Sequence, residues 1–487
     1  MSNLIEDALE AGIKLIKEGR QPEAEVIFKQ ILKVDPENLK INNLLAVMAF
    51  QMKQFGKASE YFKKCTELDP DNSDNYNDLS LTYAELGKLD MAVAIVKHAI
   101  VLSPKPLYYN NLAMHYRNQG RFDEAMKFVD LALESEPNNA QFWYNKAGVY
   151  SGLKDLNMAE SCVQKTIEIL PQPMFYGSLA LGYLLRGNWN AGWELYENRL
   201  EYLPAATYYK QMYGDNRWKG QPLENKRIVV YCEQGLGDYI LALRYIPELI
   251  KRGAIVLLHV SEDLRPLITQ NFDVSVQTKK FEEYDYHVSI MSLPHYLKIE
   301  IPTEPYLKCN YSGDFSNYDC FKIGIVWGGN PQHAADRLRC CHLSYFKKIH
   351  DIPGVKLFSL QKDARPRAYI RQPDNDQVID LTTGCEDMRI VDLSEFLNNW
   401  SNTAAFINNL DLLISIDTAV LNLAGAMGKP AWGLIPYSPD WRWGTSGEAT
   451  IWYPSLRLFR QEQFNNWEPV FDKVYQEVNK LVSACRS

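Results

Sequence analysis

The chain has 487 residues, of which 46% are hydrophobic and 23% charged, and its formal net charge at pH 7 is −8. A chain of this length has room for about three domains with cores of their own. The acidic balance, with a pI near 5.6, argues against a nucleic-acid-binding surface.

The lack of a recognisable targeting signal and the pattern of cysteines predict a cytoplasmic protein. The N-terminus lacks the charged and apolar regions of a signal peptide, and no apolar run approaches the roughly 18–20 residues of a membrane span. The 9 cysteines include no Cys-x-x-Cys pair. They are therefore expected to be reduced thiols of a cytoplasmic protein rather than zinc ligands or disulfides.

The first 170 residues repeat with a period close to 34. Prolines recur at steps of 34, 34, 33 and 34 residues, and alanines keep the same spacing. The prolines are Pro36, Pro70, Pro104, Pro137 and Pro171, and the alanines are Ala24, Ala58, Ala92, Ala125 and Ala159. This spacing resembles the tetratricopeptide repeat, in which alanine allows two helices to approach and proline ends the second helix. We expect five repeats, followed by a degenerate sixth or a capping pair over Leu179–Glu201.

The inner face of such a solenoid is formed by the first helix of each repeat, and here those helices are rich in asparagine. Carboxamides at regular spacing are able to hydrogen-bond the backbone of an extended peptide without reading its sequence. The predicted acceptor-binding groove contains Asn77, Asp78, Asn110, Asn111 and Asn145. The alternative is that these polar side chains merely line a solvated concave surface.

From Trp218 onward the pattern changes to strands that alternate with helices, which predicts two parallel sheets. The expected strands of the first are Lys226–Cys232, Ala254–Val260, Val274–Val276 and Tyr286–Ile290, with a helix over Asp238–Arg252. Those of the second are Lys322–Trp327, Val355–Gln361, Val378–Leu381 and Leu410–Ile416, with a terminal helix over Val470–Leu481. The predicted domains are an all-α solenoid (1–202) and two Rossmann-like α/β lobes (203–320 and 321–487).

Two turns of small residues follow predicted buried strands and open helices. They are Cys232–Asp238 and Ser415–Pro430. Free backbone N–H groups and the positive end of a helix dipole coincide in such a turn, which makes it suitable for binding an anion. Two of them in consecutive α/β lobes predict a shared cleft for a phosphate-bearing substrate.

Several motifs carry a resemblance to a known family. They are Glu233–Asp238, Gly324–Asn330, Asp336–Arg339, Ser359–Gln361, Ile416–Pro430, Pro439–Trp443 and Trp452–Pro454. With the repeats before them, they resemble bacterial proteins that join tetratricopeptide repeats to a GT-B glycosyltransferase domain. The catalytic half looks like glycosyltransferase family 9, the heptosyltransferases, and more distantly like the protein O-GlcNAc transferases.

The resemblance implies a general base. Asp238 matches the aspartate that is proposed to deprotonate the acceptor hydroxyl in heptosyltransferases, and Glu233 is the fallback base. A positioned carboxylate in this role contributes about 10²–10⁴-fold to the rate. The alternative for Asp238 is an ordinary helix N-cap, worth about 1 kcal/mol.

The resemblance also implies a set of donor-binding residues. Arg337 and Arg339 match the loop that supplies a cation to the donor phosphates, and an arginine suits a diphosphate leaving group where no metal is present. A surface salt bridge is the alternative. The other predicted donor-binding residues are Gly235, Gly237, Asn330, Gln361, Lys362, Asp417, Thr418 and Asn422. His333 is a lesser candidate, and Asp417 is alternatively an N-cap.

One position departs from the family, since Asn422 stands where heptosyltransferases usually have a histidine. Asparagine still donates hydrogen bonds but carries no titratable proton. The sequence Asp374–Asp376 matches an Asp-x-Asp metal signature of the other glycosyltransferase fold, but three residues match such a pattern by chance. No metal and no cofactor are expected beyond the nucleotide-sugar co-substrate.

The expected function is that of a cytoplasmic, inverting, metal-independent glycosyltransferase. Its repeats would present a protein acceptor, and a flagellin or another surface protein modified before export is the acceptor suggested by analogy. One alternative is an enzyme that acts on a glycan or lipid-linked acceptor. The other is a non-catalytic repeat adaptor with a degenerate GT-B domain.

Overall fold

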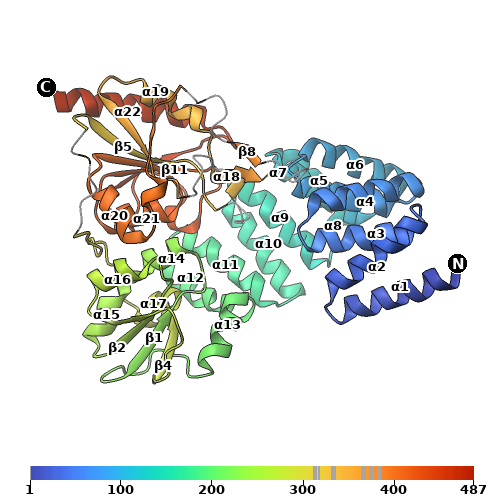
Figure 1. The fold of residues 1–487 in the computed structure, drawn as a ribbon, viewed down its shortest axis with the longest axis horizontal. Helices are drawn as coiled ribbons and strands as arrows, with labels where there is room; N and C mark the ends of the chain where they lie inside the picture. The colour runs from blue at the N-terminus through green and yellow to red at the C-terminus, as the bar shows by residue number, and fades with distance from the viewer. Residues whose placement is uncertain are drawn as a thin grey trace. The chain divides into compact units, whose positions relative to one another are not determined.

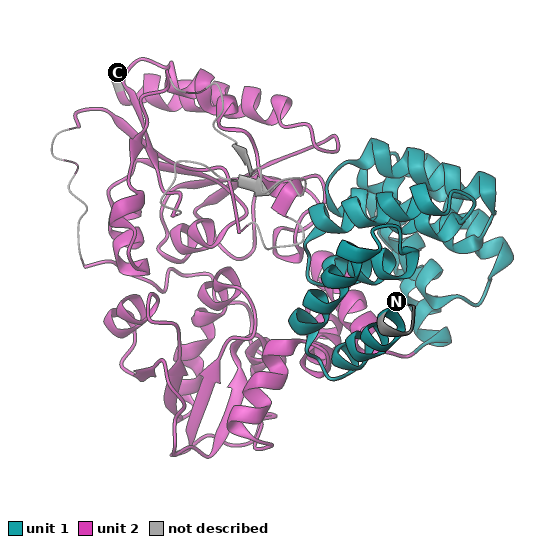
Figure 2. Cartoon of the chain, turned by 45° about the vertical axis from the view of Figure 1, so that its right-hand side comes forward, with its two compact units in different colours: residues 1–170, 371–379 teal, residues 171–370, 380–487 magenta. Residues whose placement is uncertain are grey.

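The computed structural model describes residues 2–310, 315, 318–330, 336–362, 369–371, 378–380, 385 and 387–486. The chain divides into two compact units (Figure 2). Unit 1 is Met1–Leu170 with Arg371–Ile379, and unit 2 is Pro171–Ile370 with Asp380–Ser487. The sequence placed the end of the solenoid at residue 202, whereas the structure groups the last helix pair with the α/β part. His333 and Asp374–Asp376 lie outside the described residues.

Unit 1 is built from antiparallel helix pairs (Figure 1). The helices are α1 (Ser2–Lys17), α2 (Gln21–Val34), α3 (Leu39–Gln51), α4 (Phe55–Leu68), α5 (Ser73–Glu85), α6 (Leu89–Leu102), α7 (Pro106–Asn118), α8 (Phe122–Ser135), α9 (Ala140–Gly152) and α10 (Leu156–Ile169). Ala58, Ala92 and Ala125 of the repeating alanines have no exposed surface. Because alanine is small, the two helices of a pair approach closely there, as the 34-residue spacing predicts.

Unit 2 begins with the helices α11 (Pro173–Leu185), α12 (Trp189–Tyr196) and α13 (Pro204–Tyr213). The first sheet follows and consists of β1 (Arg227–Tyr231), β2 (Ile255–His259), β3 (Ser275–Gln277) and β4 (Tyr286–Ser289). Its order is β3-β2-β1-β4, and every pairing is parallel. Its helices are α14 (Leu236–Ala242), α15 (Ile246–Lys251), α16 (Arg265–Asn271) and α17 (Leu293–Leu297).

The second sheet contains β5 (Phe321–Val326), β6 (Val355–Ser359), β9 (Val391–Asp392), β10 (Leu412–Ile416), β11 (Ala431–Ile435) and β12 (Leu456–Arg460). Its order is β12-β11-β10-β5-β6-β9, again parallel throughout. Its helices are α18 (Asp336–Arg339), α19 (Lys347–His350), α20 (Trp400–Asn408), α21 (Ala419–Ala426) and α22 (Glu468–Arg486). One apolar cluster includes residues of both sheets, among them Ile228 and Leu413.

Two expectations about these elements are wrong. The helix expected over Asp238–Arg252 is divided into α14, a 3-10 turn at Leu243–Tyr245, and α15, which has a proline in its first turn. Since proline lacks an N–H donor, a continuous helix would lose a backbone hydrogen bond at that point. The strand expected over Val378–Leu381 is β8 (Val378–Asp380), which pairs with β7 (Tyr369–Arg371) in a separate sheet instead of extending the second one.

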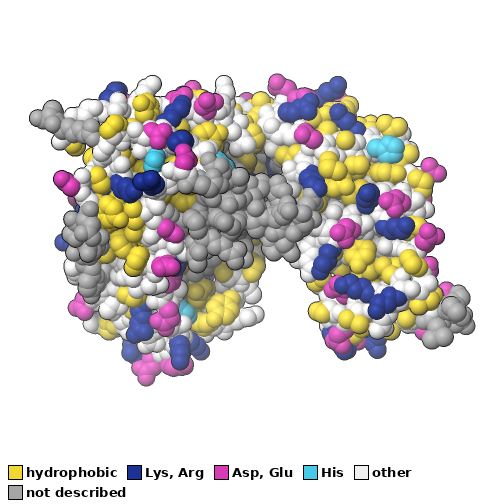
Figure 3. All heavy atoms as spheres, turned by 45° about the horizontal axis from the view of Figure 1, so that its top comes forward, with side chains coloured by type: hydrophobic (Ala, Val, Ile, Leu, Met, Phe, Trp, Pro, Cys, Tyr) yellow, Lys and Arg dark blue, Asp and Glu magenta, His cyan; other side chains and the backbone are white. Residues whose placement is uncertain are grey.

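Charged side chains of both signs are interspersed over the face drawn in Figure 3. Where its residues are described, that face shows no continuous stripe of Lys and Arg of the kind that nucleic-acid-binding proteins present. Across the part of the chain that the structure describes, no helix combines the length and the apolar character that a membrane crossing needs.

Candidate functional site

The strand order of the second sheet points to one place for a ligand. The chain runs from β5 outward to β6 and β9, then crosses by α20 to β10 and continues outward in the other direction to β11 and β12. The switch point therefore lies between β5 and β10. In open parallel sheets, ligands bind outside the carboxyl ends of the strands at such a point.

Charged side chains meet at this switch point. They come from the loops that follow β5, β10 and β11, and from the first turn of α14 after β1. The group, called the Arg442 cluster below, consists of Asp238, Asp336, Arg339, Asp417, Asp440 and Arg442. Asp238 thus joins the first sheet to residues of the second sheet.

The Arg442 guanidinium lies at the centre of the cluster and is 9% exposed. Its Nη2 donates a 2.5 Å hydrogen bond to Asp238 Oδ1. Asp417 Oδ1 lies 3.9 Å from Nη1, and Asp440 Oδ1 lies 3.3 Å from Nε. Around this one guanidinium there are consequently three carboxylates.

Arg339 joins the loop after β5 to the loop after β10. Its Nη1 donates to the Asp417 carbonyl at 3.2 Å, and its Nε donates to Asp336 Oδ1 at 3.0 Å. Gly329 makes room for this pair, because an added Cβ there would lie 2.4 Å from Asp336 Oδ1. Arg339 and Asp417, both predicted for donor binding, therefore lie side by side. Arg337 is on the same short helix and is exposed.

The helices that begin at the two small-residue turns approach each other closely. A Cβ added at Gly237 would lie 3.3 Å from Asn422 Nδ2 and 3.7 Å from the Ala419 Cα. Neither Gly235 nor Gly237 has a positive φ. Close approach, rather than backbone freedom, is therefore the reason that a glycine suits position 237.

Thr418, not Asp417, is the N-cap of α21, and Gly235, not Asp238, is the N-cap of α14. Asp238 instead occupies the first turn of its helix, where a negative charge interacts favourably with the helix dipole. The Thr418 hydroxyl makes no capping bond and lies 3.0 Å from Ser415 Oγ. The N-cap alternatives for both aspartates are therefore wrong.

The electrostatics of the cluster are dominated by burial. Burial raises the pKa of Asp238 above its ordinary value, although Arg442 acts in the opposite direction. Burial likewise raises the pKa of Asp417, against the lowering effect of Arg442. Burial lowers the pKa of Arg442, but Asp440, Asp238 and Asp417 outweigh it and raise the pKa above the ordinary value. The guanidinium therefore stays charged, while the carboxylates of Asp238 and Asp417 become stronger bases.

Glu233, the predicted fallback base, is committed elsewhere. Its side chain has no exposed surface, and its Oε1 accepts a 2.7 Å bond from Arg199 Nε. Its Oε2 accepts from the hydroxyl of Ser289. Both of its oxygens are bonded inside the protein, so Asp238 remains the preferred candidate, and the role of Glu233 as a base stays a prediction.

Two predicted donor contacts are turned inward. Asn422 has no exposed surface, donates from Nδ2 to the Thr418 carbonyl at 3.0 Å and accepts from Tyr453 at 3.1 Å. Gln361 forms a reciprocal pair with the backbone of Gly328, at 3.0 and 3.3 Å. Both amides fix the shape of the site's loops through these bonds, and their contact with the donor stays a prediction.

Lys362 and Asn330 lie at the border of the site. Lys362 Nζ is 3.1 Å from Asp263 Oδ2, and the same oxygen accepts from Trp400 Nε1 at 3.2 Å. Asp263, in the loop after β2, therefore connects Lys362 to the start of α20. Asn330 is exposed at the end of the described loop after β5.

An indole cluster supports the loop that carries Arg442. The ring of Trp441 makes edge-to-face contacts with Trp193 of α12 and with Trp452, at centroid distances of 5.3 and 5.6 Å. The Arg442 guanidinium lies 5.2 Å from the Trp441 ring centroid. The sequence marked this segment only as part of the Pro439–Trp443 motif, and no role was predicted for Arg442. The sequence feature that marks Arg442 is its place two residues after Asp440, in the loop that follows the buried strand β11.

The asparagines of the solenoid bond to one another across repeats. Asn111 Nδ2 donates to Asn77 Oδ1 at 2.8 Å, and Asn145 Nδ2 donates to Asn110 Oδ1 at 2.9 Å. Asp78 accepts from Asn77 at 3.3 Å. Part of the hydrogen-bonding capacity of the predicted groove is thus used to hold neighbouring repeats in register. Asn77, Asn110 and Asn111 are buried, whereas Asp78 and Asn145 are partly exposed.

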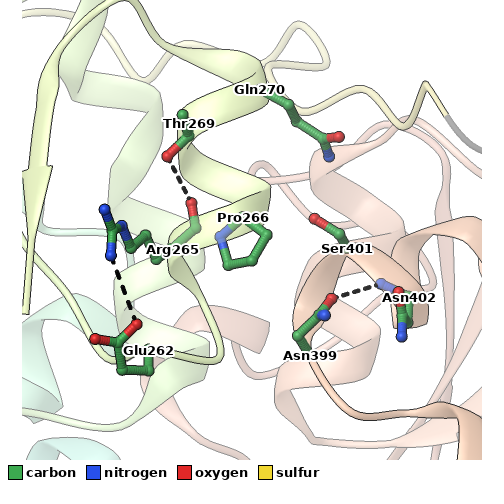
Figure 4. A pocket seen from close by; sticks show the side chains of 8 residues that line it. All are labelled: Glu262, Arg265, Pro266, Thr269, Gln270, Asn399, Ser401 and Asn402. Atoms are coloured by element: carbon green, nitrogen blue, oxygen red, sulfur yellow. Dashed lines mark hydrogen bonds and ion pairs between the residues drawn. The ribbon is translucent and has the colours of Figure 1, made fainter.

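A separate pocket of about 640 Å³ lies between α16 and the start of α20 (Figure 4). It is lined by Glu262, Arg265, Pro266, Thr269, Gln270, Asn399, Ser401 and Asn402. Its single ion pair, between Arg265 and Glu262 at 3.8 Å, joins neighbours on one segment. None of the lining residues belongs to the Arg442 cluster, and the other lining groups are neutral.

Comparison with known proteins gives the following similarities. Models of the tetratricopeptide repeat match residues 39–72, 61–94, 106–139 and 140–173. Protein FlbA of Caulobacter vibrioides (strain ATCC 19089 / CIP 103742 / CB 15) is 24% identical over 485 residues, which cover 92% of this chain and 79% of FlbA.

Solved structures resemble the repeats at low scores. The MamA protein matches with a TM-score of 0.32 and 21% identity, over 35% of this chain and 93% of MamA. TTC0263, a thermophilic tetratricopeptide-repeat protein of Thermus thermophilus, matches with a TM-score of 0.33 and 22% identity, over 37% of this chain and 99% of TTC0263. Scores in this range carry no argument about function. The chain is therefore a tetratricopeptide-repeat solenoid followed by a parallel-sheet α/β region.

Proposed function

We propose that this chain is an inverting, metal-independent glycosyltransferase of GT-B type that moves a sugar from a nucleotide-sugar to a protein acceptor held by the repeats. The observation that supports it best is the meeting of Asp238 with Arg442, Asp417 and Arg339 at the switch point of the second sheet. A carboxylate for the acceptor and guanidinium groups for the leaving diphosphate are the parts such a reaction needs.

In the proposed reaction, Asp238 takes the proton from the acceptor hydroxyl. The hydroxyl oxygen forms a bond to the anomeric carbon while the bond from that carbon to the diphosphate breaks, so the configuration inverts. The nucleoside diphosphate leaves with its negative charge opposite Arg442 and Arg339. Burial raises the pKa of Asp238 and so makes its carboxylate a stronger base.

The repeats supply the protein-binding half of the proposal. Stacked tetratricopeptide repeats form extended surfaces that bind partners. All 9 cysteines are free, which is consistent with the proposed action in the reducing cytoplasm. A protein acceptor is favoured over a glycan or lipid acceptor because a solenoid of this kind binds polypeptide through its concave face.

The test is turnover of a panel of uridine, guanosine, cytidine and adenosine diphosphate sugars by the full chain. We expect released nucleoside diphosphate for at least one sugar, and a loss of at least 100-fold with Asp238→Asn. Asp472→Asn is the matched control, because that aspartate forms a surface pair with Lys348 and lies outside the cluster. Equal background rates in the wild type and Asp238→Asn would instead favour the non-catalytic adaptor.

A further inference from the structure

The structure describes three arginines whose side chains are almost fully buried, and two of them are fully satisfied. Arg199, which is 1% exposed, donates to Glu233, Glu197, the Tyr196 carbonyl and two serine hydroxyls. Arg244, which is 2% exposed, donates to the carbonyls of Leu241, Pro302 and Trp452 at 2.8–2.9 Å. Arg199 thus uses five donors, and each nitrogen of the Arg244 guanidinium has an acceptor within the fold, since its Nη2 donates to the Tyr306 hydroxyl at 3.4 Å.

Arg442 differs from both. Among the described residues its guanidinium makes one side-chain hydrogen bond, from Nη2 to Asp238. Its Nε is buried without a hydrogen-bond partner, although Asp440 is close, and Nη1 has only the 3.9 Å contact to Asp417. A guanidinium carries five donors, and buried donors are normally paired. Nε and Nη1 of Arg442 therefore have no hydrogen-bond acceptor among the described protein groups.

The unused donors select the chemistry of the missing acceptor. Arg442 lies in the loop after β11, beside the N-terminus of α21. The N-cap residue there is Thr418, whose hydroxyl makes no capping bond. A planar guanidinium fork binds two oxygens of one phosphate, and a helix N-terminus favours the same charge. Three carboxylates already surround it, so an incoming anion reaches the fork only by displacing one of them. An oxyanion with several oxygens, such as a diphosphate, fits these groups.

We propose that Arg442 is the principal diphosphate-binding residue of the site, and that a bound diphosphate takes Arg442 away from Asp238. This inference rests on the proposed function and names the order of its steps. Without donor, Asp238 is held in an ion pair and its lone pairs face a cation. When the donor's diphosphate occupies the guanidinium, Asp238 loses its partner and becomes available to an acceptor hydroxyl. The donor consequently binds before the acceptor is deprotonated.

If Asp238 and the diphosphate compete for Arg442, substitutions at the two positions should change diphosphate affinity in opposite directions. A merely structural arginine would not produce this pattern. In Asp238→Asn, the carboxylate that competes for Arg442 is gone while the shape is retained, so the diphosphate should bind more tightly than in the wild type. In Arg442→Gln the fork and its charge are lost, so binding should be weakened. Arg442→Lys keeps a charge but not the planar fork, and should fall between the wild type and Arg442→Gln.

The experiment is isothermal titration of the full chain with inorganic pyrophosphate, the part shared by all nucleoside diphosphates. We expect about tenfold tighter binding for Asp238→Asn and at least tenfold weaker binding for Arg442→Gln, with Asp472→Asn unchanged. Circular dichroism and the melting temperature check that each variant is folded. If Arg442→Gln is unfolded, the pyrophosphate affinities of Asp238→Asn and Arg442→Lys, each compared with that of the wild type, decide whether the inference holds.

Several results would overturn the inference. They are wild-type protein that does not bind pyrophosphate at millimolar concentration, Asp238→Asn that binds no more tightly than the wild type, or Arg442→Lys and Arg442→Gln that bind as the wild type does. The proposed function fails separately. If no sugar is turned over but the variants shift pyrophosphate affinity as expected, the proposed transferase activity is refuted and the anion site is retained. If a sugar is turned over but the affinity shifts are absent, the transferase activity is retained and the role of Arg442 is refuted.

Discussion

Arg199 and Arg442 show how one residue type serves two different ends in the same unit. The Arg199–Glu233 pair is buried on both sides and also holds two serine hydroxyls, so it fastens the end of α12 to the loop after β1. Breaking a buried pair on one side costs far more than replacing both partners, because a lone charge remains in the interior.

Arg199→Met should therefore lower the free energy of unfolding by about 3–5 kcal/mol. The double variant Arg199→Met, Glu233→Met should recover most of this loss, since no unpaired charge is left. Urea unfolding of the two single variants and the double variant measures the coupling. Losses that simply add in the double variant would show that the two side chains do not act as a pair.

His115 gives a prediction in the solenoid. It is 2% exposed, and its Nε2 lies 3.3 Å from Ser80 Oγ. Burial lowers the pKa of His115 to about 4, from an ordinary value of 6.5. Between these two pH values the unfolded chain binds more protons than the folded chain, so the free energy of unfolding falls as the pH falls from 6.5 toward 4.

The part of this loss due to His115 is about 3 kcal/mol across the window. His115→Gln cannot be protonated, so its stability relative to the wild type should improve by that amount between pH 7 and pH 4. Urea unfolding of both proteins at several pH values gives the difference. A constant difference over the whole pH range would mean that His115 is not buried in its neutral form.

Residue type and spacing identified part of the site but not the direction of each side chain. Asp238, Asp417 and Arg339 follow predicted strands, and parallel topology brings such positions together. Glu233, Gln361 and Asn422 have the same kind of position, yet their side chains turn inward to bond Arg199, Gly328 and Tyr453. That choice depends on partners distant in the sequence, so the spacing of motifs was not able to show it.

At the scale of elements, the close packing of α21 depends on glycine. A Cβ added at Gly425 would lie 2.4–2.8 Å from the ring of Tyr453, which is 1% exposed and holds Asn422. The ring has no space to move into, so an added methyl group must displace the helix or the ring. Gly182 of α11 is the opposite case, because a Cβ there meets nothing within 4 Å.

Gly425→Ala should therefore destabilise the protein by about 1–3 kcal/mol, despite the better helix propensity of alanine. Gly182→Ala, the matched control, should stabilise it by about 0.5–1 kcal/mol. Thermal or urea unfolding of both variants checks the opposite signs. Stabilisation by Gly425→Ala would contradict the packing of α21 against Tyr453.

Strands were predictable where an apolar run stood alone between turns. The strands Arg227–Tyr231 and Leu412–Ile416 lie within the predicted ranges Lys226–Cys232 and Leu410–Ile416. Ala431–Ile435 and Leu456–Arg460 were missed. The first follows directly on a Gly-Lys-Pro turn, and the second has two arginines in its five residues. Their strand character comes from pairing with β10 and with each other, a tertiary cause that local propensity does not contain.

At the scale of the whole molecule, the chain forms two compact units with separate cores. Units of this kind often unfold independently. Calorimetry of the full chain should then show two transitions. A nucleoside diphosphate at about 100-fold its Kd should add about 2.7 kcal/mol to the unit that contains Arg442. Acidification from pH 6.5 toward 4 should lower the stability of unit 1 through His115. A single transition that shifts as a whole under both treatments would contradict independent units.

The most direct test of the account is a crystal structure of the full chain soaked or grown with a nucleoside diphosphate. The account predicts that the diphosphate lies at the carboxyl ends of β10 and β11, with phosphate oxygens bonded to the Arg442 guanidinium and Asp238 released from it. A diphosphate bound on a different surface, with the Arg442–Asp238 pair unchanged, would contradict the assignment of the Arg442 cluster as a sugar-nucleotide site.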